Sequence, residues 1–143
     1  MGLYANDFSD MYWILKTEPG AYSYADLERD GQTRWDGIRN YQARNNLKAM
    51  KKGDQCLIYE SVGPKELVGT AQVTREAYPD PKDSAWVCVD LKVGKRLQSP
   101  INLGQLKNHP ILRDISLVKQ SRLSVSPIGR REWDIILNLP LMS

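Results

Sequence analysis

Histidine and cysteine are scarce in this sequence of 143 residues, which holds one histidine, His109, and two cysteines, Cys56 and Cys88. Zinc fingers, zinc ribbons and two-histidine metal sites need more ligands of these types, and the H-x-E and P-C-x-x-C pattern of zinc deaminases is absent. The glycine-rich patterns of Rossmann and P-loop nucleotide sites are absent as well. We therefore expect no cofactor and no metal, and we expect both cysteines to be reduced core residues.

Long apolar runs and long polar tracts are also missing. The chain is 41% hydrophobic and 26% charged, with a mean hydropathy of −0.50. No stretch approaches the ~18 apolar residues of a membrane-spanning helix, and the first residues do not have the pattern of a secretory signal. We expect a soluble protein with no membrane partner, located in the cytoplasm, or in the nucleus if the organism is eukaryotic.

The length suits a single domain. Residues 1–10 lack hydrophobic periodicity and precede a second methionine, Met11. We expect a flexible extension over residues 1–10 and one domain over residues 11–143. The sequence leaves the oligomeric state open, with a slight preference for a monomer.

Periodicity and turn residues predict short strands mixed with short helices. Ser23 and Asp26 have the spacing of a capping box, Gly31 suits the end of that helix, and Asn102 suits a helix start. The expected strands cover residues 12–16, 55–59, 66–74, 86–93 and 117–125, and the expected helices cover residues 23–27, 40–50, 102–107 and 130–139. This pattern predicts an α+β domain built on a small β-barrel of about five to six strands with flanking helices.

Four local expectations follow, three for segments between these elements and one for a helix face. Prolines predict a loop over residues 78–81, because each restricts itself and its predecessor, and Pro100 predicts a loop before Asn102. Residues 35–37 predict a turn. Helical spacing of Tyr41, Leu47 and Met50 predicts an inner face on the second helix.

Positive charge is concentrated in two segments. Residues 34–52 carry six basic and one acidic side chain, and residues 92–131 carry nine basic and one acidic. If the two segments face the same side, they form a stripe suited to phosphates. In the first segment the arginines alternate with aromatic and amide side chains, which favours nucleic acid over a merely solvated surface.

Four strings of residues carry a family resemblance. They are Trp13-Ile14-Leu15-Lys16-Thr17-Glu18-Pro19, Trp35-Asp36-Gly37-Ile38-Arg39-Asn40-Tyr41-Gln42-Ala43-Arg44-Asn45 and Glu76-Ala77-Tyr78-Pro79-Asp80-Pro81, followed by Arg122-Leu123-Ser124-Val125. In these strings the chain resembles the EVE domain family. That family is similar to the PUA-like group of small pseudo-barrels and to the YTH domains, which read methylated adenine in RNA. At Tyr59-Glu60-Ser61 the chain departs from the Tyr-His-Ser that is common in the family.

The resemblance implies a domain that binds DNA or RNA and accepts a methylated or oxidised base flipped into an aromatic-lined pocket. Trp35 would offer a stacking face, while Thr17, Asn40 and Ser61 would meet the base edge. Cationic contacts to phosphate would come from Lys16, Arg39, Arg44 and Arg122. Tyr41, Gln42, Asn45 and Ser124 complete the set of expected nucleic-acid-binding residues, and no residue is expected to be catalytic.

Two other functional classes remain open at this stage. One is a small enzyme that acts on a modified nucleobase, with Cys56 or Ser61 as nucleophile and Asp54 or Glu60 as base. Glu60 and Ser61 are neighbours on an expected strand and would point to opposite faces, which argues against that enzyme. The other is a regulatory protein-interaction module, which leaves the polar string around Trp35 unexplained.

Overall fold

The computed structural model describes residues 11–139. The first ten residues, where the sequence predicts an extension, lie outside this range. The elements follow the chain in the order β1 (Tyr12–Thr17), α2 (Tyr24–Asp30), β2 (Gln32–Trp35), α3 (Tyr41–Ala49), β3 (Gln55–Glu60), β4 (Glu66–Asp80), β5 (Asp83–Asn102), α4 (Leu103–Asn108), the 3-10 turn η1 (Leu112–Asp114), α5 (Ser116–Lys119), β6 (Val125–Ile128) and α6 (Arg130–Asn138).

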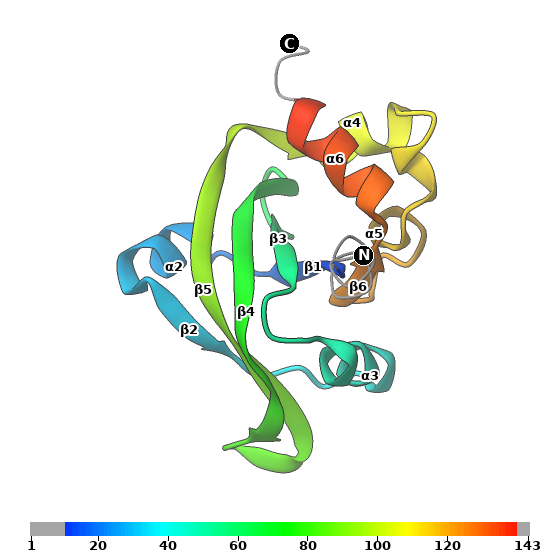
Figure 1. Ribbon diagram of the computed structural model, residues 1–143. Helices are drawn as coiled ribbons and strands as arrows, with labels where there is room; N and C mark the ends of the chain where they lie inside the picture. Colours follow the sequence, from blue (N-terminus) through cyan, green and yellow to red (C-terminus); the bar gives the residue numbers. More distant parts are fainter. Residues whose placement is uncertain (1–10, 140–143) are drawn as a thin grey trace, which may run out of the picture.

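The strands form one mixed sheet of six in the order β2-β5-β4-β3-β1-β6. β1 and β3 are parallel neighbours, and the other pairs are antiparallel. The sheet curls strongly, with α4, α5 and α6 on one side and α2 near the edge strand β2 (Figure 1). The α+β class with about six strands is confirmed; the sheet is curled rather than closed, because β2 and β6 remain its two edges.

β1 and β3 lie at the centre of the fold and are buried on both faces. Alternate residues of a strand point to opposite sides of the sheet. Trp13 and its partner Cys56 therefore lie on one side, in an apolar cluster with Trp35 and Leu47. Ile14 belongs to a second cluster beneath α4 and α6. The continuous apolar runs of these strands follow from this double burial.

The two longest strands form a hairpin that extends beyond the rest of the sheet (Figure 1). The loop predicted over residues 78–81 is wrong, because β4 continues to Asp80 and Pro79 pairs with Val87. Pro100 likewise lies within β5. Near its tip, no other strand within residues 11–139 pairs with the hairpin, so a proline there lies at a free edge, where its missing N–H breaks no ladder bond.

Two further expectations about the strands need correction. Residues 117–125 do not form one strand, since α5 covers Ser116–Lys119 and β6 begins only at Val125. Leu117 and Leu123 are buried in different clusters, which a single strand face would not allow. The turn predicted over residues 35–37 begins one residue too early, because Trp35 is still the last residue of β2.

The expected helices are present. The Ser23–Asp26 capping box begins α2, and Gly31 ends it with a φ of 77° that favours glycine. The side chains of Asn40 and Asn102 cap α3 and α4. The inner face expected for α3 is wrong at Tyr41, which is 67% exposed.

Among residues 11–139, no helix combines the length and apolarity that crossing a bilayer takes. In the same range, no three His, Cys, Asp or Glu side chains gather as a metal ion would need.

Candidate functional site

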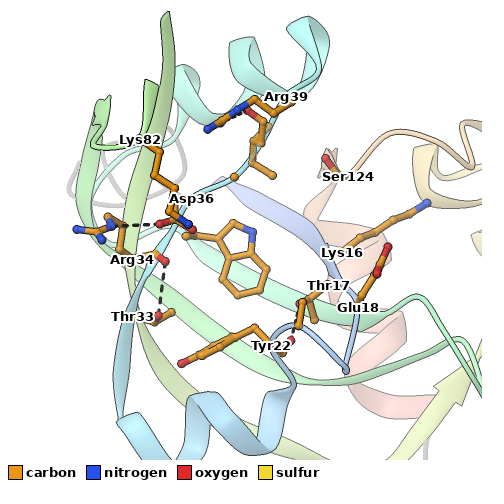
Figure 2. Close-up of a pocket in the computed structure, with 14 residues that line it drawn as sticks. Lys16, Thr17, Glu18, Tyr22, Thr33, Arg34, Asp36, Arg39, Lys82 and Ser124 are labelled. Atoms are coloured by element: carbon orange, nitrogen blue, oxygen red, sulfur yellow. Dashed lines mark hydrogen bonds and ion pairs between the residues drawn. The ribbon is translucent and has the colours of Figure 1, made fainter. Parts of the chain in front are cut away.

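A cleft of about 710 Å³ opens beside the indole of Trp35. β1 and the segment after it form one wall, and β2 with residues 36–39 forms the other. Figure 2 shows Lys16, Thr17, Glu18 and Ser124 on one side and Arg34, Asp36 and Lys82 on the other. The cleft is thus built from segments far apart in the sequence, and its shape depends on the whole fold.

Trp35 connects the cleft to the core. Its side chain is only 7% exposed, and the residue pairs with Val89 of β5. The ring of Tyr22 meets it edge to face, with the centroids 6.3 Å apart and the planes at 85°. The indole is therefore held rigidly, and only a small part of it is accessible from the cleft.

The rim of the cleft carries more positive than negative charge. Lys16, Arg34, Arg39 and Lys82 line it, against the carboxylates of Glu18 and Asp36. Arg34 pairs with Asp36 at 3.3 Å. Lys16 donates through Nζ to the carbonyl of Ser121, and burial lowers the pKa of its ammonium group.

Asp80 anchors one side of this rim from below. Its side chain is fully buried and accepts hydrogen bonds from Arg39 Nη1 (3.1 Å) and from the backbone N–H groups of Gly37 (3.0 Å) and Lys82 (2.8 Å). Burial opposes the charge, but these three donors lower the pKa of the Asp80 carboxyl. One carboxylate therefore fixes residues 36–39 against the tip of the hairpin.

Next to the cleft lies a stack that we call the aromatic ledge, made of Arg39, Tyr41, Arg44 and Trp86. The rings of Tyr41 and Trp86 are 5.1 Å apart and inclined by 33°. The Arg44 guanidinium lies 5.0 Å from the Tyr41 ring and 5.6 Å from the Trp86 ring, and Arg39 lies 5.7 Å from Trp86. These are cation–π distances.

A shallow groove of about 320 Å³ lies at the other side of α3. Asn40, Gln42 and Arg122 line it, and Gln42 donates to the side-chain oxygen of Gln120 at 3.1 Å. Lys16, which lines the cleft, reaches Ser121 of this groove. The groove, the cleft and the ledge thus follow one another around the start of α3.

The structure brings most of the expected residues to this region. Lys16, Thr17, Trp35, Arg39 and Ser124 line the cleft; Asn40, Gln42 and Arg122 line the groove; Tyr41 and Arg44 form the ledge. Asn45 is exposed on α3 and lines neither hollow.

Ser61 lies behind the cleft wall rather than in the cleft. Its hydroxyl and its backbone N–H both donate to the carbonyl of Thr17, at 3.2 and 2.9 Å. Its neighbour Glu60, which stands where the family commonly has histidine, accepts from the N–H of Tyr24 at 2.9 Å. Both side chains thus have structural partners in this chain.

Sequence reasoning missed several residues of the site, among them Tyr22, Lys82 and Trp86, and it counted Arg34 only as part of the basic stripe. It also missed the role of Asp80. The Pro79-Asp80-Pro81 string gave no sign of that role, because aspartate and proline are both typical of turns. Lys82 and Trp86 could not be placed beside the site, because residues 78–81 were expected to form a loop rather than the end of a long hairpin.

The single basic stripe predicted from the two charged segments is not formed. Lys95 and Arg96 line a separate cavity of about 630 Å³ with Trp133 and Leu137. Residues 92–97 line this cavity, whereas Arg122 lines the groove beside α3. The positive charge is therefore divided between two places.

The sequence model of the EVE domain matches residues 11–139. The chain belongs to the EVE domain family. It is 32% identical to thymocyte nuclear protein 1 of Gallus gallus in an alignment 165 positions long, which covers 90% of this chain and 68% of that protein. Curated relatives with the same name from Mus musculus and Homo sapiens are 33% and 30% identical.

Solved structures agree with this family membership. The NMR structure of Rpa0253 from Rhodopseudomonas palustris is 40% identical, with a TM-score of 0.87 over 93% of this EVE chain and 95% of the other. The crystal structure of human THYN1 protein in complex with 5-methylcytosine-containing DNA is 30% identical, with a TM-score of 0.83 over 91% and 97%. This match confirms the PUA-like fold that the resemblance implied.

The expected relation to YTH domains holds at the level of the fold. The YTH domain of Zygosaccharomyces rouxii MRB1, solved with N6-methyladenosine RNA, is 14% identical, with a TM-score of 0.56 over 91% of this EVE chain and 83% of that one.

Proposed function

We propose that this EVE domain binds nucleic acid that carries a modified base, DNA above all, holds that base in the cleft beside Trp35 and releases it unaltered. The observation that carries the proposal is the cleft itself, which places the rigid Trp35 indole among four cationic side chains. Its volume of about 710 Å³ lies in the usual range of small-molecule sites. The human relative solved with 5-methylcytosine-containing DNA supports DNA as the ligand.

The energetics indicate how such a site would discriminate. Burial of one added methyl group contributes only ~0.8 kcal/mol, which is too little for selective binding. Stacking on an aromatic ring contributes about 1–3 kcal/mol per base and favours every base alike. Selectivity therefore has to come from close apolar walls combined with hydrogen bonds to the base edge. Ser124 and Thr17 line the cleft and offer short polar groups for that purpose. The Thr17 hydroxyl donates to the carbonyl of Tyr22, so towards a base it would act as an acceptor.

The positions of the reactive side chains support binding without chemistry. Cys56 and Cys88 are buried in the sheet, and burial raises the pKa of both thiols. His109 accepts through Nδ1 from the backbone of Ile111 and Leu112, beside α4. None of these three side chains lines the cleft.

A titration with labelled oligonucleotides tests the proposal. Strands that differ only in one central cytosine, 5-methylcytosine or oxidised cytosine are titrated with the wild type, Trp35→Phe and Lys82→Gln. We expect the wild type to favour a modified strand and Trp35→Phe to reduce that preference. Lys82→Gln should weaken binding to all strands alike, because a rim cation contacts phosphate.

Arg113→Gln is the matched control, since it removes the same charge from the exposed turn η1, which lines none of the three hollows. Mass analysis of the recovered strands should show unaltered bases. Equal affinity of the wild type for all strands contradicts a modified-base reader, and conversion of the base identifies an enzyme instead.

A further inference from the structure

We infer that the aromatic ledge is a second subsite, which stacks the unpaired base next to the one held in the cleft. This inference rests on the proposed function and names the form of its ligand: a strand whose neighbouring base is free to stack, rather than an intact duplex. The evidence comes from the geometry of Tyr41 and its surroundings.

Tyr41 exposes a large aromatic surface at a fixed position. Its side chain is 67% exposed, although one side of the ring is in contact with Trp86 at 5.1 Å. Tyr41 is the first residue of α3, directly after the Asn40 cap, which accepts from the N–H of Ala43 at 2.9 Å. The ring therefore stands on a well-anchored helix start and presents its open side to solvent.

The ledge is braced before any ligand arrives. Arg44, one turn after Tyr41, donates through Nη1 to the carbonyl of Ala85 at 3.0 Å, while its guanidinium lies against both rings. This contact ties α3 to the hairpin. Because the rings are already ordered, a stacking partner loses little affinity to side-chain ordering.

The ledge and the cleft share a residue. Arg39 lines the cleft and also lies 5.7 Å from the Trp86 ring, which in turn contacts Tyr41. Asp80 holds the Arg39 guanidinium in place between the two. A strand with one base in the cleft thus has its next base on the side of Tyr41, with a cation between them.

The chemistry of the ledge indicates a nucleotide rather than an apolar protein segment. Two guanidinium groups accompany two aromatic rings, a combination that suits a flat base joined to a phosphate. The carboxylate of Asp83 at the hairpin tip accepts a hydrogen bond from the N–H of Ala85 at 3.1 Å, so it has a partner within its own turn. A base paired inside a duplex has no free face to offer, so the ledge favours an unpaired neighbour.

A coupled experiment tests the ledge. Short single strands with a central 5-methylcytosine are made in two forms, one with natural neighbouring bases and one with abasic sites at both neighbours. Each is titrated with the wild type, Tyr41→Ala and Tyr41→Phe, and a 5-methylcytosine duplex is added as a third ligand. Leu137→Ala, an exposed apolar substitution at the separate cavity, is the control.

We expect loss of the neighbouring bases to weaken wild-type binding about tenfold, and Tyr41→Ala to weaken binding of the natural strand by the same factor. Tyr41→Ala should not further weaken binding of the abasic strand, because the two changes remove the same contact. Tyr41→Phe and Leu137→Ala should bind like the wild type, and the duplex should bind more weakly than the single strand. Thermal unfolding of each variant checks that the fold is intact.

The ledge is refuted if Tyr41→Ala weakens both strands equally or weakens neither, or if the duplex binds as tightly as the single strand. The ratio of affinities for 5-methylcytosine and cytosine is measured in the same titrations and reports on the cleft alone. A wild type that lacks this preference but shows the coupling overturns the proposed function and keeps the ledge. A wild type that prefers 5-methylcytosine but shows no coupling between Tyr41 and the neighbouring bases keeps the proposed function and overturns the ledge.

Discussion

The carboxylate of Asp80 accepts a hydrogen bond from the guanidinium of Arg39 at 3.1 Å, across 41 positions of the sequence. The Asp80 side chain is fully buried, whereas that of Arg39 is 38% exposed. Asp80 also accepts from two backbone N–H groups, those of Gly37 and Lys82. The pair therefore couples a buried anchor to a cation that faces the cleft.

Asp80→Asn should make the protein less stable. It should also make that stability less sensitive to acid pH. Replacement of this carboxylate leaves one donor of a buried network unpaired, which costs about 1–3 kcal/mol. The folded-state pKa of Asp80 is depressed, so its contribution is present above the ordinary aspartate pKa of 3.8 and is lost as pH falls through the lower folded value. Urea unfolding of the wild type and the variant between pH 7 and pH 3 measures both effects. A variant that loses stability in acid as steeply as the wild type would argue against this role.

Trp35→Ala should destabilise the fold as well as the cleft. The side chain is 7% exposed and packs in the core, so its truncation costs about 3–5 kcal/mol. Trp86→Ala should cost less, because that side chain is only partly buried. Chemical denaturation of both variants tests the order, and a Trp35→Ala loss no greater than that of Trp86→Ala would show that the indole is dispensable to the core.

Arg122→Gln should flatten the salt dependence of nucleic-acid binding. Arg122 is exposed in the groove beside α3. If it contacts one phosphate, its loss reduces the slope of log affinity against log salt by about 0.7–0.9. Titrations at several salt concentrations measure the slope, with Arg113→Gln as the charge-matched control. An unchanged slope would remove Arg122 from the phosphate contacts.

Both thiols should be inert in the folded protein. Cys56 and Cys88 are fully buried, and burial raises the pKa of each thiol, so little thiolate forms. A colorimetric thiol reagent should react slowly under native conditions and should find two equivalents in denaturant. Rapid reaction of one equivalent with the native protein would contradict the burial of that cysteine.

Features encoded within a few neighbouring residues were predictable from the sequence. The Ser23–Asp26 capping box and the Asn102 cap are present as expected, because each needs only residues three positions apart. The EVE resemblance likewise rested on contiguous strings. Five of the expected site residues share the cleft because those strings lie at adjoining positions of the fold.

Features that depend on tertiary contacts were not predictable. Pro79 can lie in a strand because none of the other strands that the structure describes pairs with the hairpin tip, and no local pattern reveals such a free edge. Tyr41 follows helical spacing with Leu47, yet its ring points to Trp86 of the hairpin. The roles of Asp80 and Ser61 depend on partners more than 40 positions away.

Because the Trp35 indole is part of the core and also faces the cleft, evolution cannot alter it for one purpose without affecting the other. A mutation that reshapes the cleft at this position needs compensating changes elsewhere in the interior. Lys82 is exposed and Ser124 is half-buried, so substitutions at these two positions disturb the packing of the core less than substitutions at Trp35. New ligand preferences within this lineage are therefore more accessible through changes at the rim than through changes beneath it.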